Sequence, residues 1–217
     1  MPTPAIPDLN GITPLMRAAA ANDSSRIAEL VAEGHDVNAK DAAGSSALIY
    51  GVANDGEEAA LMLMFHKADL SATNRNAETA LIIAARKQMN QVVQRWAVMG
   101  APFDAQENQH GRTALMTAIV KEDIWAACRL VDAGADFDTL KDFRGDTALS
   151  LAKLKFAGED LGYFMHAVDA QRAAANAATR AQKAAQEEIA HGAGALTKPI
   201  AAPHTASFRR KSQKPLP

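Results

Sequence analysis

The chain has 217 residues, of which 48% are hydrophobic and only 5% aromatic, and its formal net charge is −2. This length predicts one domain with a tail, and the single cysteine, Cys128, excludes an intramolecular disulfide. The charge is uneven, because residues 192–217 hold five basic residues and no acidic one, which leaves −7 on the rest of the chain. An acidic body is poorly suited to a phosphate backbone, so nucleic acid is not the expected partner.

The sequence shows neither a secretory signal nor a membrane span. Its first residues lack the basic stretch and the apolar run of a signal peptide. The longest strongly apolar run, residues 59–65, is too short to cross a bilayer. We therefore expect a cytoplasmic protein without a membrane partner, and a secreted effector that acts inside another cell is the alternative.

A five-residue phrase recurs along the chain at a nearly constant spacing. It reads Gly-Ile-Thr-Pro-Leu at residues 11–15 and returns in related form at 44–48, 77–81, 111–115 and 145–149. Successive copies begin 33, 33, 34 and 34 residues apart. A fixed period of this length predicts a repeat array, in which each unit stacks on its neighbours and buries a continuous core.

Each unit predicts two helices. The first helix begins after a Thr, or after Ser46 in the second unit, whose hydroxyl is suited to cap backbone N–H groups. This helix contains a column of leucines, which are Leu15, Leu48, Leu81, Leu115 and Leu149. The second helix has a core column made of Leu30, Leu63, Trp96, Leu130 and Phe164. Glycines at positions 34, 100 and 134 suit the left-handed conformation that ends a helix.

The pattern resembles the ankyrin repeat, whose characteristic phrase is close to G-x-T-P-L-H-x-A-A, with G-A-D near the end of the second helix. The stretches Thr-Pro-Leu-Met at 13–16 and Gly-Ala-Asp at 134–136 carry the resemblance best, and it covers roughly residues 8–168. The resemblance implies an all-α helix-turn-helix solenoid of about five repeats. It also implies a non-catalytic module for protein–protein interaction that serves as a scaffold, an inhibitor or an effector.

The chain then divides into four expected parts: an N-terminal extension at 1–7, the repeat domain at 8–169, an alanine-rich helix at 170–191 and a disordered basic tail at 192–217. Ten of the 22 residues from 170 to 191 are alanine, a strong helix former. We expect this helix to continue and cap the last repeat, and docking onto a partner is the alternative. The tail, with Arg-Arg-Lys at 209–211, offers a second possible function in regulation or nucleic-acid contact.

Three departures from the family pattern predict a less regular array. The histidine that usually follows the leucine is absent from all five units. Ala77 replaces the turn glycine of the third unit and Lys67 replaces the helix-ending glycine of the second, and a left-handed residue other than glycine costs about 1 kcal/mol. The fourth and fifth units each gain one residue, which we place in the loops at 106–110 and 140–144.

In ankyrin arrays, partners usually meet the loop tips and the exposed face of the first helices, which together form a concave groove. The matching positions are the expected partner-binding residues: Tyr50, Asn76, Glu78, Arg86, Lys87, His110, Arg112, Lys121, Phe143, Arg144 and Lys155. Repeats three to five also concentrate basic residues, which are Arg75, Arg86, Lys87, Arg112, Lys121, Arg144 and Lys155. This basic patch predicts a partner with an acidic surface, since complementary charge raises on-rate and selectivity. The alternative is that these charges only keep the surface soluble.

A second candidate contact lies on the second helix of repeat two. Met62 and Phe65 occupy columns that accept charged residues in other units, so both are expected to face water and form an apolar patch. The patch predicts partner docking or self-association. Alternatively, a helix shift at Lys67 buries both side chains. Apart from this patch, we expect a monomer.

The sequence contains no recognisable catalytic or metal-binding constellation. The six histidines show no zinc-ligand spacing with a cysteine nearby. Cys128 stands among apolar residues of a second helix and is expected to be an inert thiol. We therefore expect no enzyme activity, no cofactor and no metal.

Overall fold

The computed structural model describes residues 8–100 and 102–195, with side chains as far as Glu187. Within this part, β structure is limited to isolated antiparallel bridges at Lys40–Ser46, Thr73–Thr79 and Lys141–Thr147, so the predicted all-α fold class is confirmed. In chain order the helices are α1 Pro14–Ala20, α2 Ser24–Ala32, α3 Ala47–Ala53, α4 Glu57–Phe65, α5 Ala80–Arg86, α6 Asn90–Met99, α7 Ala114–Val120, α8 Ile124–Asp132, α9 Ala148–Lys155 and α10 Gly158–Ala195.

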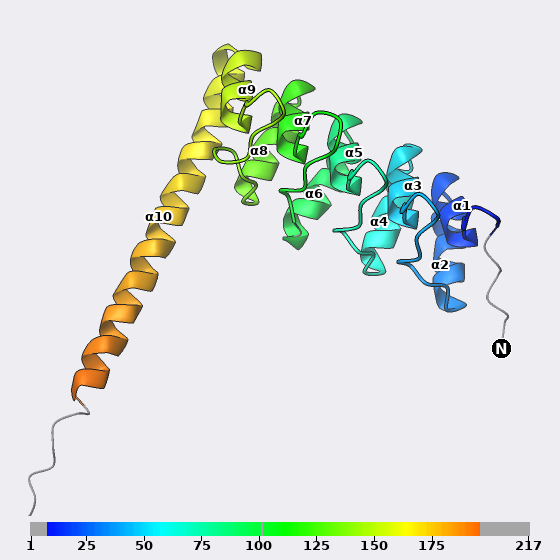
Figure 1. The fold of residues 1–217 in the computed structure, drawn as a ribbon, viewed down its shortest axis with the longest axis horizontal. Coiled ribbons are helices and arrows are strands. Elements are labelled where there is room, and N and C mark those ends of the chain that lie inside the picture. Colours follow the sequence, from blue (N-terminus) through cyan, green and yellow to red (C-terminus); the bar gives the residue numbers. More distant parts are fainter. Residues whose placement is uncertain (1–7, 101, 196–217) are drawn as a thin grey trace, which may run out of the picture. The chain divides into compact units, whose positions relative to one another are not determined.

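The helices of the repeats form two rows, which can be followed in Figure 1. The first helices of successive units contact one another in the order α1, α3, α5, α7 and α9. The second helices α2, α4, α6 and α8 contact one another in the same order and pack against the first row. Each unit therefore touches the next through its helices, which is the arrangement of a repeat solenoid.

Threonine side chains start most of the first helices, as the repeated phrase predicts. Thr13, Thr79, Thr113 and Thr147 each accept a hydrogen bond from the backbone N–H three residues later. The same expectation is wrong for Ser46, whose buried hydroxyl has no hydrogen-bond partner. Serine lacks the β-branch that restricts χ1 in threonine, so its hydroxyl is not held toward the helix.

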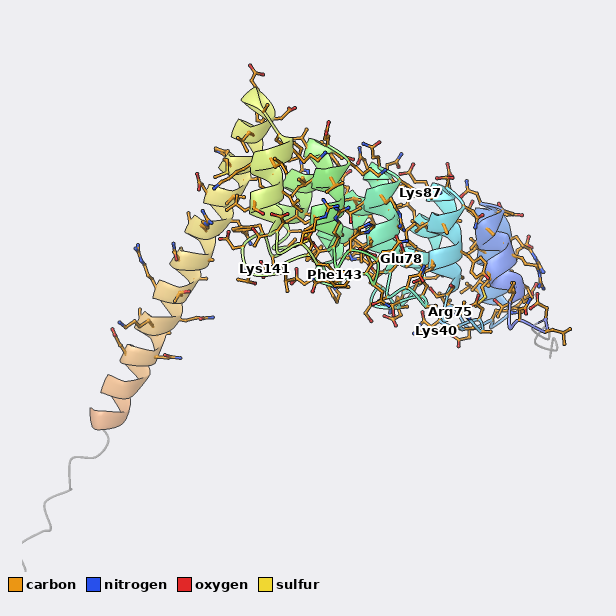
Figure 2. All side chains as sticks on the ribbon, turned by 45° about the horizontal axis from the view of Figure 1, so that its top comes forward. Lys40, Arg75, Glu78, Lys87, Lys141 and Phe143 are labelled. Atoms are coloured by element: carbon orange, nitrogen blue, oxygen red, sulfur yellow. The ribbon has the colours of Figure 1, made fainter. Side chains whose placement is uncertain are left out.

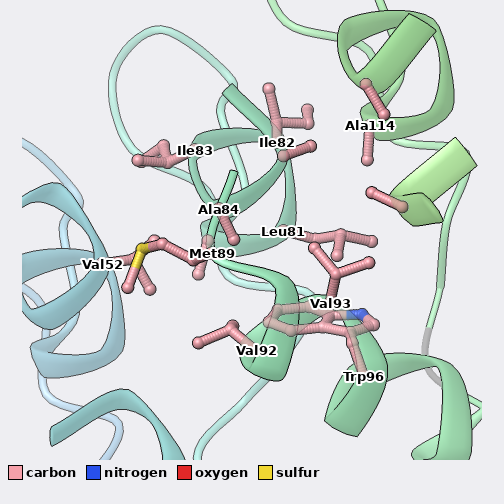
Figure 3. Packing of buried hydrophobic residues seen from close by; sticks show 14 of the residues in the cluster. Val52, Leu81, Ile82, Ile83, Ala84, Met89, Val92, Val93, Trp96 and Ala114 are labelled. Carbon is pink, nitrogen blue, oxygen red and sulfur yellow. The ribbon is translucent and has the colours of Figure 1, made fainter. Parts of the chain in front are cut away.

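A column of apolar side chains from the second helices fills the space between the two rows. Its members are all buried, as predicted: Leu30, Leu63, Trp96, Leu130 and Phe164. Figure 3 shows Trp96 packed beside Val93 and below Leu81 in the third unit. Burying a leucine-sized side chain stabilises a fold by about 1.5 to 3 kcal/mol, so this column contributes strongly to every unit.

Left-handed residues end the helices and form the loop turns. Gly34, Gly100 and Gly134 have φ angles of 90°, 61° and 100°. Lys67 and Ala77 have φ angles of 61° and 56°, which confirms that a residue with a side chain is held in the left-handed region at each position. A third set of left-handed residues was not predicted. It lies at the residue that follows the C-cap of α1, α3, α5 and α7, and its members are Asn22, Asp55, Gln88 and Glu122.

Helix α10 runs without a break from the last repeat into the alanine-rich segment. The chain divides into two compact units between Ala174 and Ala175, and the side chains of residues 175–187 in the second unit are exposed. The expected disordered tail at 192–217 begins too early, because α10 continues to Ala195. The expected extension at 1–7 and the rest of the tail, residues 196–217, lie outside the described residues. No helix of the described part is both long enough and apolar enough to cross a membrane.

Candidate functional site

One acceptor side chain fixes the loop tip of each unit. In the second unit, Asp41 Oδ1 accepts hydrogen bonds from Ala43 N at 2.8 Å and from Ser45 N at 2.7 Å. The residues that act in this way along the chain are Asp8, Asp41, Asn74, Glu107 and Asp142. The sequence reasoning missed this column, although its members recur 33, 33, 33 and 35 residues apart. Asp and Asn side chains that bond the backbone two residues later are typical of turns.

The fourth loop uses a longer acceptor for a longer turn. Glu107 stands four residues before Gly111, whereas the acceptor stands three residues before the glycine position in the other units. Its carboxylate accepts hydrogen bonds from the backbone N–H groups of Gln109, His110 and Arg112 at 2.6, 2.8 and 3.3 Å. The extra residue of this unit therefore lies within the predicted loop at 106–110, and the additional methylene of glutamate lets one side chain span it.

Backbone hydrogen bonds join the tips of neighbouring units. Asn108 N donates to Asn76 O at 2.9 Å, and Phe143 N donates to His110 O at 2.8 Å. The predicted contact residues Asn76, His110 and Phe143 thus belong to one row of loops, where Figure 2 labels Phe143. The Phe143 side chain is 72% exposed, and its ring lies against Gly111, where an added Cβ would meet the ring at 2.6 Å.

Two hollows lie along the first helices, beside the loops. The Tyr50 hollow, of about 470 Å³, lies between the second and third units, and its lining includes Ile49, Tyr50, Ala53, Glu78, Ile83, Arg86 and Lys87. The Lys121 hollow, of about 230 Å³, lies between the third and fourth units, and its lining includes Ile82, Arg86, His110, Arg112, Val120 and Lys121. Arg86 lines both, and we call the two hollows together the groove.

Seven of the eleven predicted partner-binding residues line the groove, and four do not. Asn76 and Phe143 lie at loop tips, as described above. Arg144 is exposed in the fifth loop, and its backbone N–H donates to Asp142 Oδ1 at 2.9 Å. Lys155 lies at the end of α9. Apart from Asn76, the structure therefore brings together the predicted residues of units two to four, and it leaves those of unit five apart.

Tyr50 forms a fixed wall of the Tyr50 hollow. Its hydroxyl donates a hydrogen bond to Asp41 Oδ2 at 2.8 Å, which ties the wall to the residue that holds the loop tip. Burial, together with the hydrogen bond to Asp41 and its negative charge, raises the pKa of Tyr50 to about 12. The phenol therefore stays neutral at physiological pH and keeps its donor role.

An ion pair holds Arg86 in place between the two hollows. Arg86 Nη2 lies 2.5 Å from Oε1 of Glu78, and Asn74 Nδ2 donates to the other oxygen at 2.9 Å. Burial alone would raise the pKa of Glu78, but the hydrogen bonds from Asn74 and Arg86 outweigh burial and lower it. The glutamate therefore stays ionised, and the Arg86 guanidinium is oriented before any partner arrives.

The expected basic patch is not a continuous positive surface, because acidic residues lie against four of its seven members. Those pairs are Arg86–Glu78 at 2.5 Å, Lys87–Asp55 at 2.8 Å, Arg112–Asp142 at 3.8 Å and Lys155–Glu122 at 3.6 Å. Figure 2 also shows Arg75 among the loops, away from Lys87 at the end of α5. Arg86–Glu78 lies within the third unit, whereas the other three pairs join neighbouring units, so an acidic residue of the same or an adjacent unit neutralises each of these cations.

Lys121 departs from this pairing. Lys87, Lys121 and Lys155 are the C-cap or last residues of three successive first helices, and each follows its predecessor by 34 residues. The left-handed residue of the preceding unit is Asp55 for Lys87 and Glu122 for Lys155, but it is the neutral Gln88 for Lys121. Within the described residues, no carboxylate therefore lies within 4.0 Å of the Lys121 ammonium group, and Lys121 is one of the residues that line the Lys121 hollow.

The predicted apolar patch on α4 is smaller than expected. Phe65 is 70% exposed, in agreement with its column, and its ring meets the ring of His66 edge to face at 5.2 Å between centroids. Met62 is half-buried and packs against the core, so the expectation that it faces water is wrong. At this helix position a charged side chain extends into solvent, whereas a flexible methionine side chain can turn toward the core.

Comparison with known families places this geometry in context. A family model described as ankyrin repeats (3 copies) matches residues 3–74 and again residues 63–141. The chain belongs to the ankyrin-repeat family. Ankyrin repeats are generally protein–protein interaction modules and are typically non-enzymatic. The match ends just before the fifth ankyrin-like phrase, yet the structure builds that unit with the same devices, a turn held by Asp142 and a helix capped by Thr147.

Proposed function

We propose that this protein binds a protein partner through the groove over the second to fourth repeats, as a non-catalytic scaffold, inhibitor or effector. The observation that carries the proposal is that Arg86 lines both hollows, so two hollows over three repeats adjoin at one side chain. Binding sites are typically concave, mostly apolar and already formed, with a few placed polar groups. The groove has this character, because Tyr50 and Arg86 are each fixed by a hydrogen bond to an acidic side chain.

The Tyr50 hollow suits an apolar side chain of the partner. Ile49, Ala53 and Ile83 belong to the apolar part of its lining, and Tyr50 adds an aromatic ring. The polar groups at its edge, Glu78 and Arg86, already satisfy each other. An extended segment that lies along the loops and inserts one aliphatic or aromatic residue would bury this surface without leaving a charge unpaired.

The Lys121 hollow suits an acidic side chain of the same segment. The support is that Gln88 is neutral, whereas Asp55 and Glu122 at the equivalent positions are acidic. The Lys121 ammonium group therefore lacks the carboxylate that Lys87 and Lys155 have. A partner carboxylate placed there would give Lys121 an ion pair like those of Lys87 and Lys155. We therefore propose an extended partner segment that combines an apolar residue with an acidic one, and a protein that binds it as a monomer in the cytoplasm.

Affinity capture with charge-matched variants tests this proposal. Lys121→Glu reverses the charge in the groove, and Lys183→Glu makes the same change on the exposed surface of α10. We expect wild type and Lys183→Glu to retain the same partner and Lys121→Glu to lose it. Equal retention by both variants would refute the groove as the binding site. Lys121 is preferable to Arg86 as a target, because removing Arg86 would also leave Glu78 buried without its cation.

A further inference from the structure

The row of second helices, which the groove does not use, carries most of the exposed apolar surface. Of the eight large hydrophobic side chains that the described part exposes, five belong to second helices: Phe65, Val98, Met99, Trp125 and Tyr163. Trp and Tyr are the residue types most enriched at the energetic centres of protein interfaces. The α8 and α10 end of this row therefore stands out as a second contact surface.

Trp125 and Tyr163 border a hollow of about 270 Å³, which we call the Trp125 hollow. Trp125 comes from α8 and is 38% exposed, and Tyr163 comes from the first turns of α10 and is 65% exposed. Ile124 and Cys128 complete its apolar part, and Arg129 and Asp132 supply its charged lining. Two aromatic rings thus flank an apolar space that is open to solvent.

The charged side chains that line this hollow, Asp132 and Arg129, are of opposite sign, and Asp160 adds a negative charge that acts on Cys128 from outside the lining. Asp132 lines it directly, and both Asp132 and Asp160 act on the Cys128 thiol at its floor. Together with burial, which is the largest cause, they raise the pKa of Cys128 to about 11, against the opposing effect of Arg129. A positive group entering the hollow would therefore be attracted by two carboxylates and opposed by one guanidinium.

The protein already contains an example of the contact that the hollow would make. The Arg129 guanidinium carbon lies 5.7 Å from the centre of the Trp125 ring, within the range of a cation–π interaction. Lysine and arginine also have apolar stems, which pack on apolar surface while the charged end stays in water. A side chain of this kind matches both the apolar lining and the Asp132 carboxylate.

We propose that the Trp125 hollow receives a lysine or arginine side chain of a protein partner, as a second contact independent of the groove. The stem lies between Trp125 and Tyr163, and the cation meets Asp132 in the lining. An ankyrin array with both contacts would bind an acidic residue of a partner in the groove and a basic residue of a partner in the Trp125 hollow.

Two blocked peptides test this assignment on the full-length protein: N-acetyl-Gly-Arg-Gly-amide and its neutral counterpart with Gln in place of Arg. The readout is the indole N–H signal of Trp125 in a two-dimensional NMR spectrum, assigned with Trp125→Phe. The second tryptophan, Trp96, is fully buried and reports that the fold is intact. We expect the Trp125 signal to move with the Arg peptide and not with the Gln peptide.

Charge variants test whether the acidic residues favour binding of the Arg peptide and whether Arg129 opposes it. Asp132→Asn and Asp160→Asn should each lower the affinity for the Arg peptide by up to about fivefold, which is the upper range for an exposed ion pair. Arg129→Gln should tighten it, because the opposing charge is gone. Equal responses to the two peptides, or affinities that ignore all three variants, would overturn the proposal. A Trp125 signal that moves with protein concentration alone would also overturn it, by showing a second copy in the hollow.

Discussion

Glycine at positions 67 and 77 should make this protein more stable, although glycine usually destabilises a folded chain. Lys67 and Ala77 have φ angles of 61° and 56°, in the region that an L-residue with a side chain rarely adopts. The equivalent residues at these two positions in other units are mostly glycine, as at Gly34 and Gly44. Both substitutions would restore the residue that the backbone requires.

The size of the effect follows from two opposing contributions. Replacing a residue that has a side chain by glycine in the left-handed region relieves about 1 to 2 kcal/mol of steric cost. Glycine gives back about 0.5 to 1 kcal/mol through the greater entropy of the unfolded chain. Lys67 is exposed, so little packing is lost with its side chain. We expect a net gain of about 0.5 to 1 kcal/mol at each site, which for a slope of about 2 kcal/mol/M raises the urea midpoint by about 0.3 to 0.5 M.

Urea unfolding followed by far-ultraviolet circular dichroism measures this gain for Lys67→Gly, Ala77→Gly and the double variant. Ala85→Gly is the control for glycine within a helix, because Ala85 is buried in α5, and it should lose about 1 kcal/mol. Gly111→Ala is the converse control, because it adds a Cβ at a φ of 69° and against the Phe143 ring. A midpoint for Ala77→Gly that falls as it does for Ala85→Gly would refute the reasoning.

Three further results are expected. Thr113→Ala should cost about 1 kcal/mol in urea unfolding, because it removes a helix cap, whereas Ser46→Ala should cost nothing, because that hydroxyl has no partner; equal losses would contradict this. Cys128 should react with iodoacetamide at pH 8 far more slowly than glutathione, and faster as the pH approaches its pKa of about 11, which mass spectrometry can follow. Arg86→Gln should lose about 1 to 2 kcal/mol at neutral pH. Since the pKa of Glu78 is lowered in the folded state, this loss should shrink as acid protonates Glu78, and a pH-independent loss would count against the pair.

The repeated phrase predicted most of the fold because each copy acts locally. A threonine hydroxyl caps the helix three residues away, and the column of Trp96 follows from helix periodicity. The failures are equally local in origin. Ser46 has the right atom but not the restricted rotamer, and Met62 has the exposed position but a side chain able to turn inward.

The candidate site was only partly predictable, because its chemistry depends on contacts between units. The alignment placed Lys87 and Lys121 on the same face, but it did not show that the left-handed turn residue of one unit reaches the lysine of the next. The resulting difference between Asp55 and Gln88 decides which ammonium group is open. The Trp125 hollow was missed for a related reason, since it lies between Trp125 of α8 and Tyr163 of α10, which belong to different units.

The most direct test of the proposed function is the Kd of a captured partner for wild type, Lys121→Gln and Gln88→Glu. Lys121→Gln removes the open cation of the groove, and Gln88→Glu supplies it with an internal carboxylate, as Asp55 does for Lys87. We predict that both variants weaken binding, each by about two- to fivefold at physiological salt, because each removes one exposed ion pair with the partner. A Kd that is the same for all three proteins would contradict the account.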